Sequence, residues 1–529
     1  MMKKSQLRAI FAWGAEVLEH LFAKKPISTL VTEVSAANRL RRVLGPFALT
    51  NLGIGCIIGA GIFVVTGIVA HDKTGPSLIL SFTIAGLACV FAALCYAEFA
   101  SMVPVAGSAY TYAYATLGEL FAWIIGWDLV LEYTVAAASV ASAWSHYLFS
   151  FLSVLGVQLP VPLASTPFDY NPLTRHLTFT GALLDLPALL VVLGLTVLLV
   201  LGIRESAEFN TSMVIVKVSV VLFVIVVGAF YVHPANWHPF APFGYAGLAL
   251  FGKTVWGQTG TAGEPIGMLA GAAMLFFAYI GFDAVSTQTE EAKNPQRDVP
   301  FGIIVSLIVA TLLYIAVSAI LTGMVPYQLI DVNAPVADAF SRVGLRWAQF
   351  IISIGAITGI TSVLLVLMLS QPRIMLAMSR DGLLPERFFA AVHQRFRTPW
   401  KSTILTGIAV GLLASLVPLR ILAELVNIGT LLAFVIVCTA VLVMRKTNPH
   451  AVRPFRCPWV PVTPILGIGL CVLLMFSLPS ENWYRLLVWL IIGLIIYFGY
   501  GHRNSALGRA LRAEESAGLR ENDEHNHGR

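Results

Sequence analysis

The chain has 529 residues, of which 57% are hydrophobic and only 12% charged, and its mean hydropathy is +0.80. Soluble domains carry about 25% charged residues, so the composition excludes an ordinary soluble protein. The net charge of +6 resides mostly in loops and tails between apolar blocks. This distribution favours orientation in a membrane over binding to nucleic acid.

The apolar residues form long blocks, and blocks of about 20 residues span a bilayer core of about 30 Å. The sequence therefore predicts an all-α polytopic membrane protein with about twelve transmembrane helices. The third and eighth blocks are longer than a bilayer requires, which indicates tilt or extension into the cytoplasm. In chain order the predicted spans are 47–70, 77–103, 119–152, 183–203, 209–232, 266–289, 300–324, 346–378, 403–418, 421–444, 461–479 and 483–500.

The two ends of the chain are predicted to lie in the cytoplasm. Residues 1–45 form a basic, amphipathic segment without a cleavable signal peptide, and most Lys and Arg residues fall on the side of this segment. Residues 501–529 are polar and are predicted to be a disordered cytoplasmic tail. The six cysteines fall mostly within spans and form no CxxC pair, so neither a metal site nor a disulfide framework is predicted.

The first span is interrupted by glycine. It contains four glycines within nine residues, and each costs about 1 kcal/mol relative to alanine inside a helix. One interpretation is close helix packing. The other is an unwound break at Gly59-Ala60-Gly61, whose free backbone groups line a polar cavity. A dinucleotide-binding loop is excluded because no strand precedes the glycines.

The sixth span carries a counterpart at Tyr279-Ile280-Gly281, followed by Asp283. Paired interruptions in the first span of each five-span half point to the binding site of an inverted-repeat transporter. Helix N-termini at the breaks attract a carboxylate, and freed carbonyls accept hydrogen bonds from an ammonium. The pair of breaks therefore predicts a site for a zwitterion such as an amino acid.

Lys217 lies in the middle of the fifth predicted span. A charged lysine at the bilayer centre costs roughly 3 kcal/mol or more, and Lys217 is too central for snorkelling to be the favoured explanation. Because desolvation disfavours the ammonium, the side chain can load and release a proton. Protonated, it can act as a built-in cation that braces the first break. We therefore predict Lys217 as the proton-coupling residue.

Further ionisable residues have two interpretations each. Glu132 in the third span contacts the substrate region or a proton path, or is a structural, hydrogen-bonded carboxyl. Asp283, Arg297 and Arg373 are candidates for an inner gate. For Arg297 and Arg373, which lie in or near loops, the alternative is a solvated loop whose basic residues follow the excess of Lys and Arg on the cytoplasmic side.

Three motifs resemble the amino acid–polyamine–organocation superfamily, most closely its cationic amino acid transporter branch in the short bacterial form. The resemblance covers roughly residues 40–500. The motifs are GIGCIIGAGIFVVTG, FFAYIGFDAVSTQTEEAKNPQRDVP and QPRIMLAMSRDGLLP.

The resemblance implies a LeuT-type five-plus-five inverted repeat, with repeats at 46–232 and 265–444, and two additional helices at 445–500. It implies that the substrate's α-carboxylate and α-amine bind the backbone at the breaks, that Tyr279 covers the substrate, and that Thr361 and Ser362 lie near a sodium-like position. The candidate substrate-binding residues are Ile57, Gly59, Ala60, Gly61, Glu132, Ala278, Tyr279 and Gly281.

The expected function is alternating-access transport of L-amino acids across the plasma (inner) membrane, with proton symport. The partners are the amino acid, protons and membrane lipids, with no cofactor, metal or nucleic acid. Apolar residues around 360–368 favour small neutral substrates, although cationic ones stay open. An obligate exchanger is the alternative. A channel would require a selectivity-filter motif, and the sequence has none. The sequence also has no enzyme motif such as HExxH or GxSxG.

Overall fold

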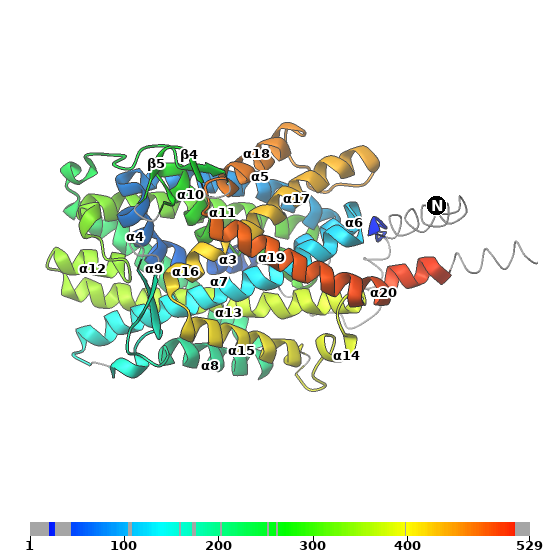
Figure 1. The fold of residues 1–529 in the computed structure, drawn as a ribbon, viewed down its shortest axis with the longest axis horizontal. Helices are drawn as coiled ribbons and strands as arrows, with labels where there is room; N and C mark the ends of the chain where they lie inside the picture. Colours follow the sequence, from blue (N-terminus) through cyan, green and yellow to red (C-terminus); the bar gives the residue numbers. More distant parts are fainter. Residues whose placement is uncertain are drawn as a thin grey trace, which may run out of the picture.

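The computed structural model shows an elongated bundle of helices, most of which run along its long axis (Figure 1). The described residues 21–26 and α20 (His502–Asn504) lie at the same end of the bundle (Figure 1). The structure describes residues 21–26, 44–103, 108–157, 160–171, 176–201, 204–250, 253–260, 263–396 and 398–513.

The first half of the chain begins with a broken helical run and continues with long helices. Gly75 has a positive φ (+60°) and turns the chain between this broken run and the long helix α5 (Leu78–Met102). The elements are α3 (Pro46–Ile57), η1 (Gly61–Val65), α4 (Thr66–Val69), η2 (Ala70–Thr74), η3 (Gly75–Ser77), α5 (Leu78–Met102), α6 (Ser108–Thr116), α7 (Glu119–Val154), η4 (Val161–Leu163), α8 (Leu186–Leu201), α9 (Arg204–Gly228), η5 (Ala229–Tyr231) and η6 (Pro234–Trp237).

The second half repeats this order of a broken run followed by long helices. Its elements are α10 (Met268–Leu275), η7 (Phe276–Tyr279), η8 (Asp283–Glu291), α11 (Pro295–Met324), η9 (Tyr327–Leu329), α12 (Pro335–Arg342), α13 (Arg346–Arg380), α14 (Glu386–Phe389), α15 (Trp400–Leu416), α16 (Leu419–Leu425), α17 (Asn427–Thr447), α18 (Val462–Met475), α19 (Ser480–Ile496), η10 (Tyr497–Gly501) and α20 (His502–Asn504).

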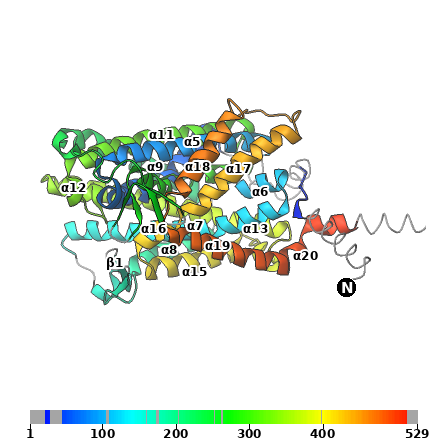
Figure 2. The ribbon, with the colours of Figure 1, turned by 45° about the horizontal axis from the view of Figure 1, so that its top comes forward.

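The strands form three small two-stranded antiparallel sheets within connections between helices. The first pairs Phe168 with Phe179, the second pairs Leu250 with Lys253, and the third pairs Gln258 with Ile266. The strands are β1 (Phe168–Asn171), β2 (His176–Phe179), β3 (Leu248–Leu250), β4 (Lys253–Trp256), β5 (Gln258–Thr259) and β6 (Pro265–Ile266). The labelled strands β1, β4 and β5 lie on the half of the bundle away from α20 (Figures 1 and 2).

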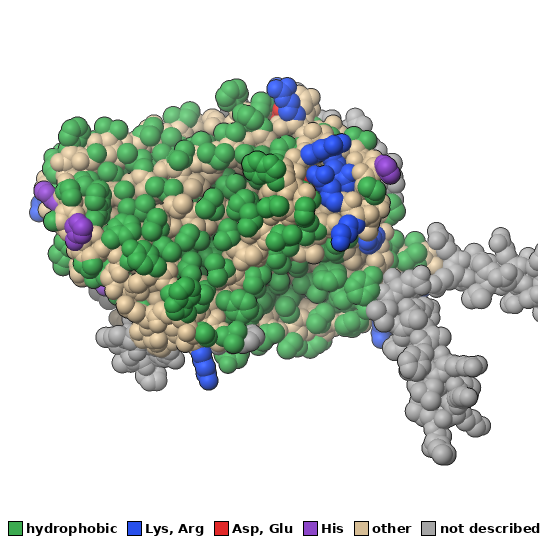
Figure 3. Space-filling model, turned by 90° about the horizontal axis from the view of Figure 1, so that it is seen from above, with side chains coloured by type: hydrophobic (Ala, Val, Ile, Leu, Met, Phe, Trp, Pro, Cys, Tyr) green, Lys and Arg blue, Asp and Glu red, His purple; other side chains and the backbone are tan. Residues whose placement is uncertain are grey.

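The core lies between α7 and α13 and between α5, α11 and α3, which are the most extensively packed pairs. Outer helices instead expose apolar side chains: on α8, Leu190, Leu193 and Val197 are 57%, 41% and 58% exposed. Figure 3 shows one face covered with hydrophobic side chains, with Lys and Arg gathered at one end. Such a continuous apolar surface fits contact with lipid chains and not with water.

The helices agree with the predicted spans in position. Within the described residues, eight helical runs are long and apolar enough to cross a membrane, and three shorter apolar helices have 10–17 residues. One run, Pro46–Met102, contains the first two predicted spans. The number of crossings and the five-plus-five repeat remain predictions, because length and composition alone do not place a bilayer.

The predicted disordered tail is too long. Residues 502–504 and 506–513 are helical, and Ser505 between them is fully buried. Apolar and hydroxyl side chains in this stretch pack against the bundle. The overall composition of the tail is polar, so composition alone does not reveal this packing. Residues 514–529, and most of the amphipathic segment 1–45, lie outside the described residues. Besides α20, the short helices α6, α12 and α14 lie outside every predicted span.

Candidate functional site

Both predicted interruptions are breaks in helical structure. The first helix, α3, ends at Ile57, and Ile58 turns to an extended conformation (ψ 104°) before η1 begins at Gly61. In the second run, α10 tightens into η7, Ile280 is extended (ψ 131°), and Gly281 has φ +112°. A residue with a side chain rarely adopts that φ, so Gly281 allows the break in the helix between η7 and η8.

The two breaks touch each other. A Cβ placed on Gly61 would lie 2.3 Å from the Cβ of Ala278, and a Cβ on Gly59 would lie 2.5 Å from Val363 Cγ2. Glycine is therefore required at both positions by close approach. The contact between Gly61 and Ala278 brings segments from the two halves of the chain to one point, in the middle of the bundle.

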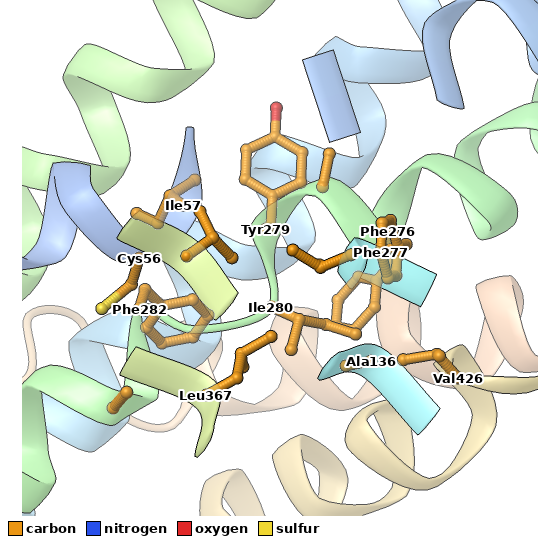
Figure 4. Packing of buried hydrophobic residues seen from close by; sticks show 14 of the residues in the cluster. Cys56, Ile57, Ala136, Phe276, Phe277, Tyr279, Ile280, Phe282, Leu367 and Val426 are labelled. Atoms are coloured by element: carbon orange, nitrogen blue, oxygen red, sulfur yellow. The ribbon is translucent and has the colours of Figure 1, made fainter. Parts of the chain in front are cut away.

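A small cavity with room for about one water molecule lies at this point. Opposite the breaks, the wall is formed by α7 and α13, and each helix contributes two residues that lie one turn apart. Figure 4 shows the packing around it, with Cys56, Ile57, Ile280, Leu367 and Ala136 labelled. The lining residues are Cys56, Ile57, Ala60, Gly61, Ala136, Val140, Phe277, Ile280, Val363 and Leu367.

The cavity wall offers backbone polarity at the breaks and apolar side chains elsewhere. Ala136 and Val140 come from α7, and Val363 and Leu367 come from α13. No Lys, Arg, Asp or Glu is among the ten lining residues. The polar groups available to a ligand at this cavity are therefore mainly peptide groups.

Lys217 is fully buried and binds the first break directly. Its Nζ donates to the carbonyl oxygens of Gly55 at 2.6 Å and Ile58 at 2.9 Å, and to Ser362 Oγ at 3.3 Å. Ser362 also lies 2.8 Å from Asn210 Oδ1. The end of α3 carries unpaired carbonyls and partial negative charge, so an ammonium at this place neutralises the helix terminus.

Asp283 holds the second break. Its carboxylate accepts a hydrogen bond from the Tyr133 hydroxyl at 2.7 Å and one from the backbone N–H of Gly281 at 3.3 Å. Asp283 thus fixes the turn at Gly281 from within the bundle and links it to α7. Its position is deep in the core (2% exposed), next to the break.

Tyr314 on α11 joins the two breaks and was not predicted from the sequence. Its hydroxyl lies 2.7 Å from the Ile57 oxygen and 2.8 Å from the Ala278 oxygen. The only signal in the sequence is a tyrosine in the middle of an apolar span, where a hydroxyl requires a partner. Such a residue is common enough in membrane helices that its partner could not be foreseen.

Tyr279 lies beside the cavity but is not among the lining residues. Its hydroxyl donates to the carbonyl oxygen of Phe82 at 2.9 Å, and its ring packs edge-on against Phe82 and Tyr314. The side chain therefore points toward α5 in this structure (Figure 4).

Glu132 is directed away from the cavity. Its carboxylate pairs with Arg485 of α19 at 2.9 Å and accepts a hydrogen bond from Thr430 of α17 at 3.3 Å. Ala136, one turn further along α7, is the residue that lines the cavity. The residues of α7 that line the cavity, Ala136 and Val140, therefore lie one and two turns along the same helix face from Glu132.

The two arginines proposed for gating lie apart from the central cavity. Arg297 is exposed in the first turn of α11. Arg373 on α13 lines a second small cavity with Leu199, Thr398 and Thr403. In the described part of the chain, no group of three His, Cys, Asp or Glu side chains is arranged to hold a metal ion.

Comparison with known proteins gives a consistent picture. Residues 44–497 match the family model described as amino acid permease. The chain is 50% identical over 490 residues to the branched-chain amino acid permease BcaP of Bacillus subtilis, covering 92% of this chain and 99% of the relative. It is 46% identical over 492 residues to a methylthioribose transporter of the same organism, covering 93% and 100%. It is 40% identical over 416 residues to the vacuolar cationic amino acid transporter 4 of Arabidopsis thaliana, covering 78% and 65%.

Proposed function

The chain belongs to the amino acid permease family, within the amino acid–polyamine–organocation superfamily, and from this premise we propose that it moves L-amino acids together with protons by alternating access. It is a multi-pass membrane transporter and not an enzyme. We place it in the plasma membrane with both termini in the cytoplasm, because the basic residues favour that side.

The proposed substrate site is the cavity between the two breaks. The N-terminus of η1, at Ala60 and Gly61, provides N–H groups and a partial positive charge for the α-carboxylate. The carbonyl oxygens at the ends of α3 and η7 accept hydrogen bonds from the α-ammonium. Ile57, Gly59 and Gly281 complete the proposed site through their backbone conformations.

The substrate side chain is proposed to be small and apolar. It would face Ala136, Val140, Val363 and Leu367, none of which can pair with a charge. A buried ammonium or guanidinium without a partner is strongly disfavoured. One relative is named as a branched-chain amino acid permease, which supports this choice; others are named as cationic amino acid transporters, so cationic substrates are the alternative.

Proton coupling is assigned to Lys217, and its contacts with the Gly55 and Ile58 oxygens carry the proposal. When protonated, the ammonium bridges two carbonyls at the end of α3 and holds the first break. When deprotonated, it loses the charge that those carbonyls attract. Protonation would therefore change the stability of one arrangement of the binding site relative to another.

The test is uptake of radiolabelled amino acids into proteoliposomes, with a pH gradient as the only driving force. We expect accumulation of aliphatic amino acids by the wild type and its loss in Lys217→Met. The matched control is Lys253→Met, because Lys253 lies exposed on β4. Full accumulation by Lys217→Met would disprove the assignment.

An obligate exchanger gives a different result in the same vesicles. It requires amino acid on both sides and does not concentrate substrate from a pH gradient alone. Uptake only into preloaded vesicles would therefore favour exchange, and absence of any amino acid uptake would disprove transport of this class.

A further inference from the structure

The hairpin formed by β3 and β4 turns apolar side chains outward. Leu250 on β3 is 52% exposed, and Val255 and Trp256 on β4 are 71% and 66% exposed. The other face of the hairpin is turned inward, since Ala249 is only 3% exposed. A hairpin that covers a protein in water has the opposite arrangement, with apolar side chains on the inner face and polar ones on the outer face. The outward face of this hairpin therefore fits surroundings other than water.

An irregularity in the strand pairing brings these side chains to the outside. Ala249 pairs with Thr254. The residue before it, Leu248, pairs with Trp256 and not with Val255, so Val255 is an extra residue on β4, as in a β-bulge. In a regular strand, Val255 would point to the face opposite Thr254 and Trp256. The bulge instead leaves Thr254 half-buried while Val255 and Trp256 are both exposed.

The hairpin is attached to the turn between α18 and α19. The N–H of Ala249 donates to the carbonyl oxygen of Phe476, the first residue after α18, at 2.6 Å. The Phe476 ring packs against Trp483 in the first turn of α19, with ring centroids 5.6 Å apart. Figure 1 shows β4 close to α18 at the top of the bundle, and Figure 3 shows that face covered with hydrophobic side chains. The ends of these two helices therefore fix the position of the hairpin along the bundle.

The beginning of α19 lies at a boundary of the hydrocarbon layer. The helical run Ser480–Asn504 has 25 residues and is apolar enough to cross a membrane. At about 1.5 Å per residue, it is only slightly longer than a hydrocarbon core of about 30 Å, so its two ends lie close to the two boundaries. Its outward side is apolar, because Leu487, Val488 and Ile491 are 52%, 57% and 56% exposed. The hairpin, attached just before this run begins, lies at the same boundary.

The exposed side chains are those that the boundary layer of a membrane favours. Trp and Tyr are enriched there because their rings are amphipathic. Trp256 is one such residue, and Tyr484 at the start of α19, which is 67% exposed, is another. Lys253 is exposed and pairs with Leu250, so its stem can lie along apolar surface while its ammonium stays among lipid phosphates. Neither strand carries an Asp or Glu that lipid phosphates would repel.

We propose that the β3–β4 hairpin is a membrane anchor, and that its partner is the lipid surface around α18 and α19. Leu250, Val255 and Trp256 enter the layer between the headgroups and the acyl chains, which extends the lipid-facing surface of α19 onto a connection outside the predicted spans. This continuity identifies lipid, and not a second protein, as the partner. The hairpin belongs to the connection between α9 and α10, so the anchor fixes the chain that enters the second broken run. The anchor depends on neither the substrate nor the coupled ion.

A spin label on the hairpin reports whether it lies in lipid. All six native cysteines are buried, so a cysteine introduced at an exposed position can be labelled selectively with a nitroxide in the otherwise unchanged protein. The labelled protein is placed in vesicles of phosphatidylcholine and phosphatidylglycerol. Collisions of the nitroxide with oxygen, which concentrates in the acyl layer, are then compared with collisions with a water-soluble nickel chelate. We expect frequent oxygen collisions and few nickel collisions for Val255→Cys.

Two matched positions calibrate the measurement. Ile491→Cys lies on the lipid-facing side of α19, and Arg342→Cys lies on α12, at the end of the bundle away from α20 (Figure 1), where the arginine side chain is 45% exposed. The ratio of oxygen to nickel collisions for Val255→Cys should resemble that of Ile491→Cys and exceed that of Arg342→Cys severalfold. Leu250→Cys should give the same result from the other strand.

Nickel collisions for Val255→Cys as frequent as for Arg342→Cys would overturn the proposal, because the hairpin would then lie in water. Few collisions with both reagents would also overturn it, because protein would then cover the hairpin. A second measurement removes the ring from the Leu250→Cys protein. Trp256→Ser should raise the nickel collisions severalfold and Trp256→Phe should leave them low, whereas equal collisions in these two variants would contradict insertion of Trp256.

Discussion

The hydroxyl of Tyr314 provides the sharpest test of how the two breaks are held. Tyr314→Phe removes one oxygen and leaves the ring in place, so no large cavity forms. The lost group lies 2.7 Å from the Ile57 oxygen and 2.8 Å from the Ala278 oxygen. A buried acceptor left without its donor costs about 1–3 kcal/mol. If this cost falls on the arrangement that binds substrate, affinity falls about five- to 150-fold.

The assay is calorimetric titration of the purified transporter with its best-transported amino acid, together with its thermal midpoint in detergent. Tyr96→Phe is the matched control, because the Tyr96 hydroxyl is equally buried and has no hydrogen-bond partner among the described residues. Removing an unpartnered hydroxyl should be close to neutral. If Tyr314→Phe binds substrate as well as Tyr96→Phe does, the hydroxyl does not hold the breaks.

Two further predictions concern packing and charge. Gly61→Ala places a methyl group 2.3 Å from the Ala278 Cβ and should destabilise the protein by about 1–3 kcal/mol. We expect this variant to lose uptake at normal expression. The control is Gly469→Ala, which should transport normally because the space around Gly469 is open. Glu98→Gln removes the carboxylate that binds Arg445 at 2.7 Å and Arg453 at 3.2 Å; we expect a loss of about 3–5 kcal/mol as a lowered thermal midpoint. Asp338→Asn, in an exposed pair with Arg342, should change stability by about 1 kcal/mol or less, and equal effects of these two variants would contradict the reasoning.

Much of the helical arrangement could be predicted, because the membrane imposes it on the sequence. Apolar blocks mark the helices, clustered glycines mark the break at Gly59, and a single glycine close to Asp283 marks the break at Gly281. Lys217 could also be predicted as a buried group that needs acceptors, since an unpaired ammonium in an apolar block has no other stable solution. Its acceptors at Gly55 and Ile58 follow from the break itself.

The partners of other buried polar groups could not be predicted, because they depend on how helices rotate against one another. Glu132 and Ala136 lie one turn apart on α7, and the sequence does not show which of them faces the cavity. Glu132 has its own partner, Arg485, on α19, a helix far away in the chain. The packed stretch around Ser505 was missed for a related reason: its contacts are with Glu119 and Asp381, and the local composition is that of a solvated tail.

The Tyr314 hydroxyl has a consequence for which ligands the site prefers. A hydroxyl carries one hydrogen, yet two carbonyl oxygens from opposite breaks lie within reach of it. This single hydrogen can be directed at only one of the two oxygens at a time, which leaves a deficit of one donor from Tyr314. An incoming ammonium brings three hydrogens and removes this deficit, whereas a carboxylic acid without an amine brings none to that place. The shortage of donors alone should make the site discriminate between an amino acid and its deaminated analogue.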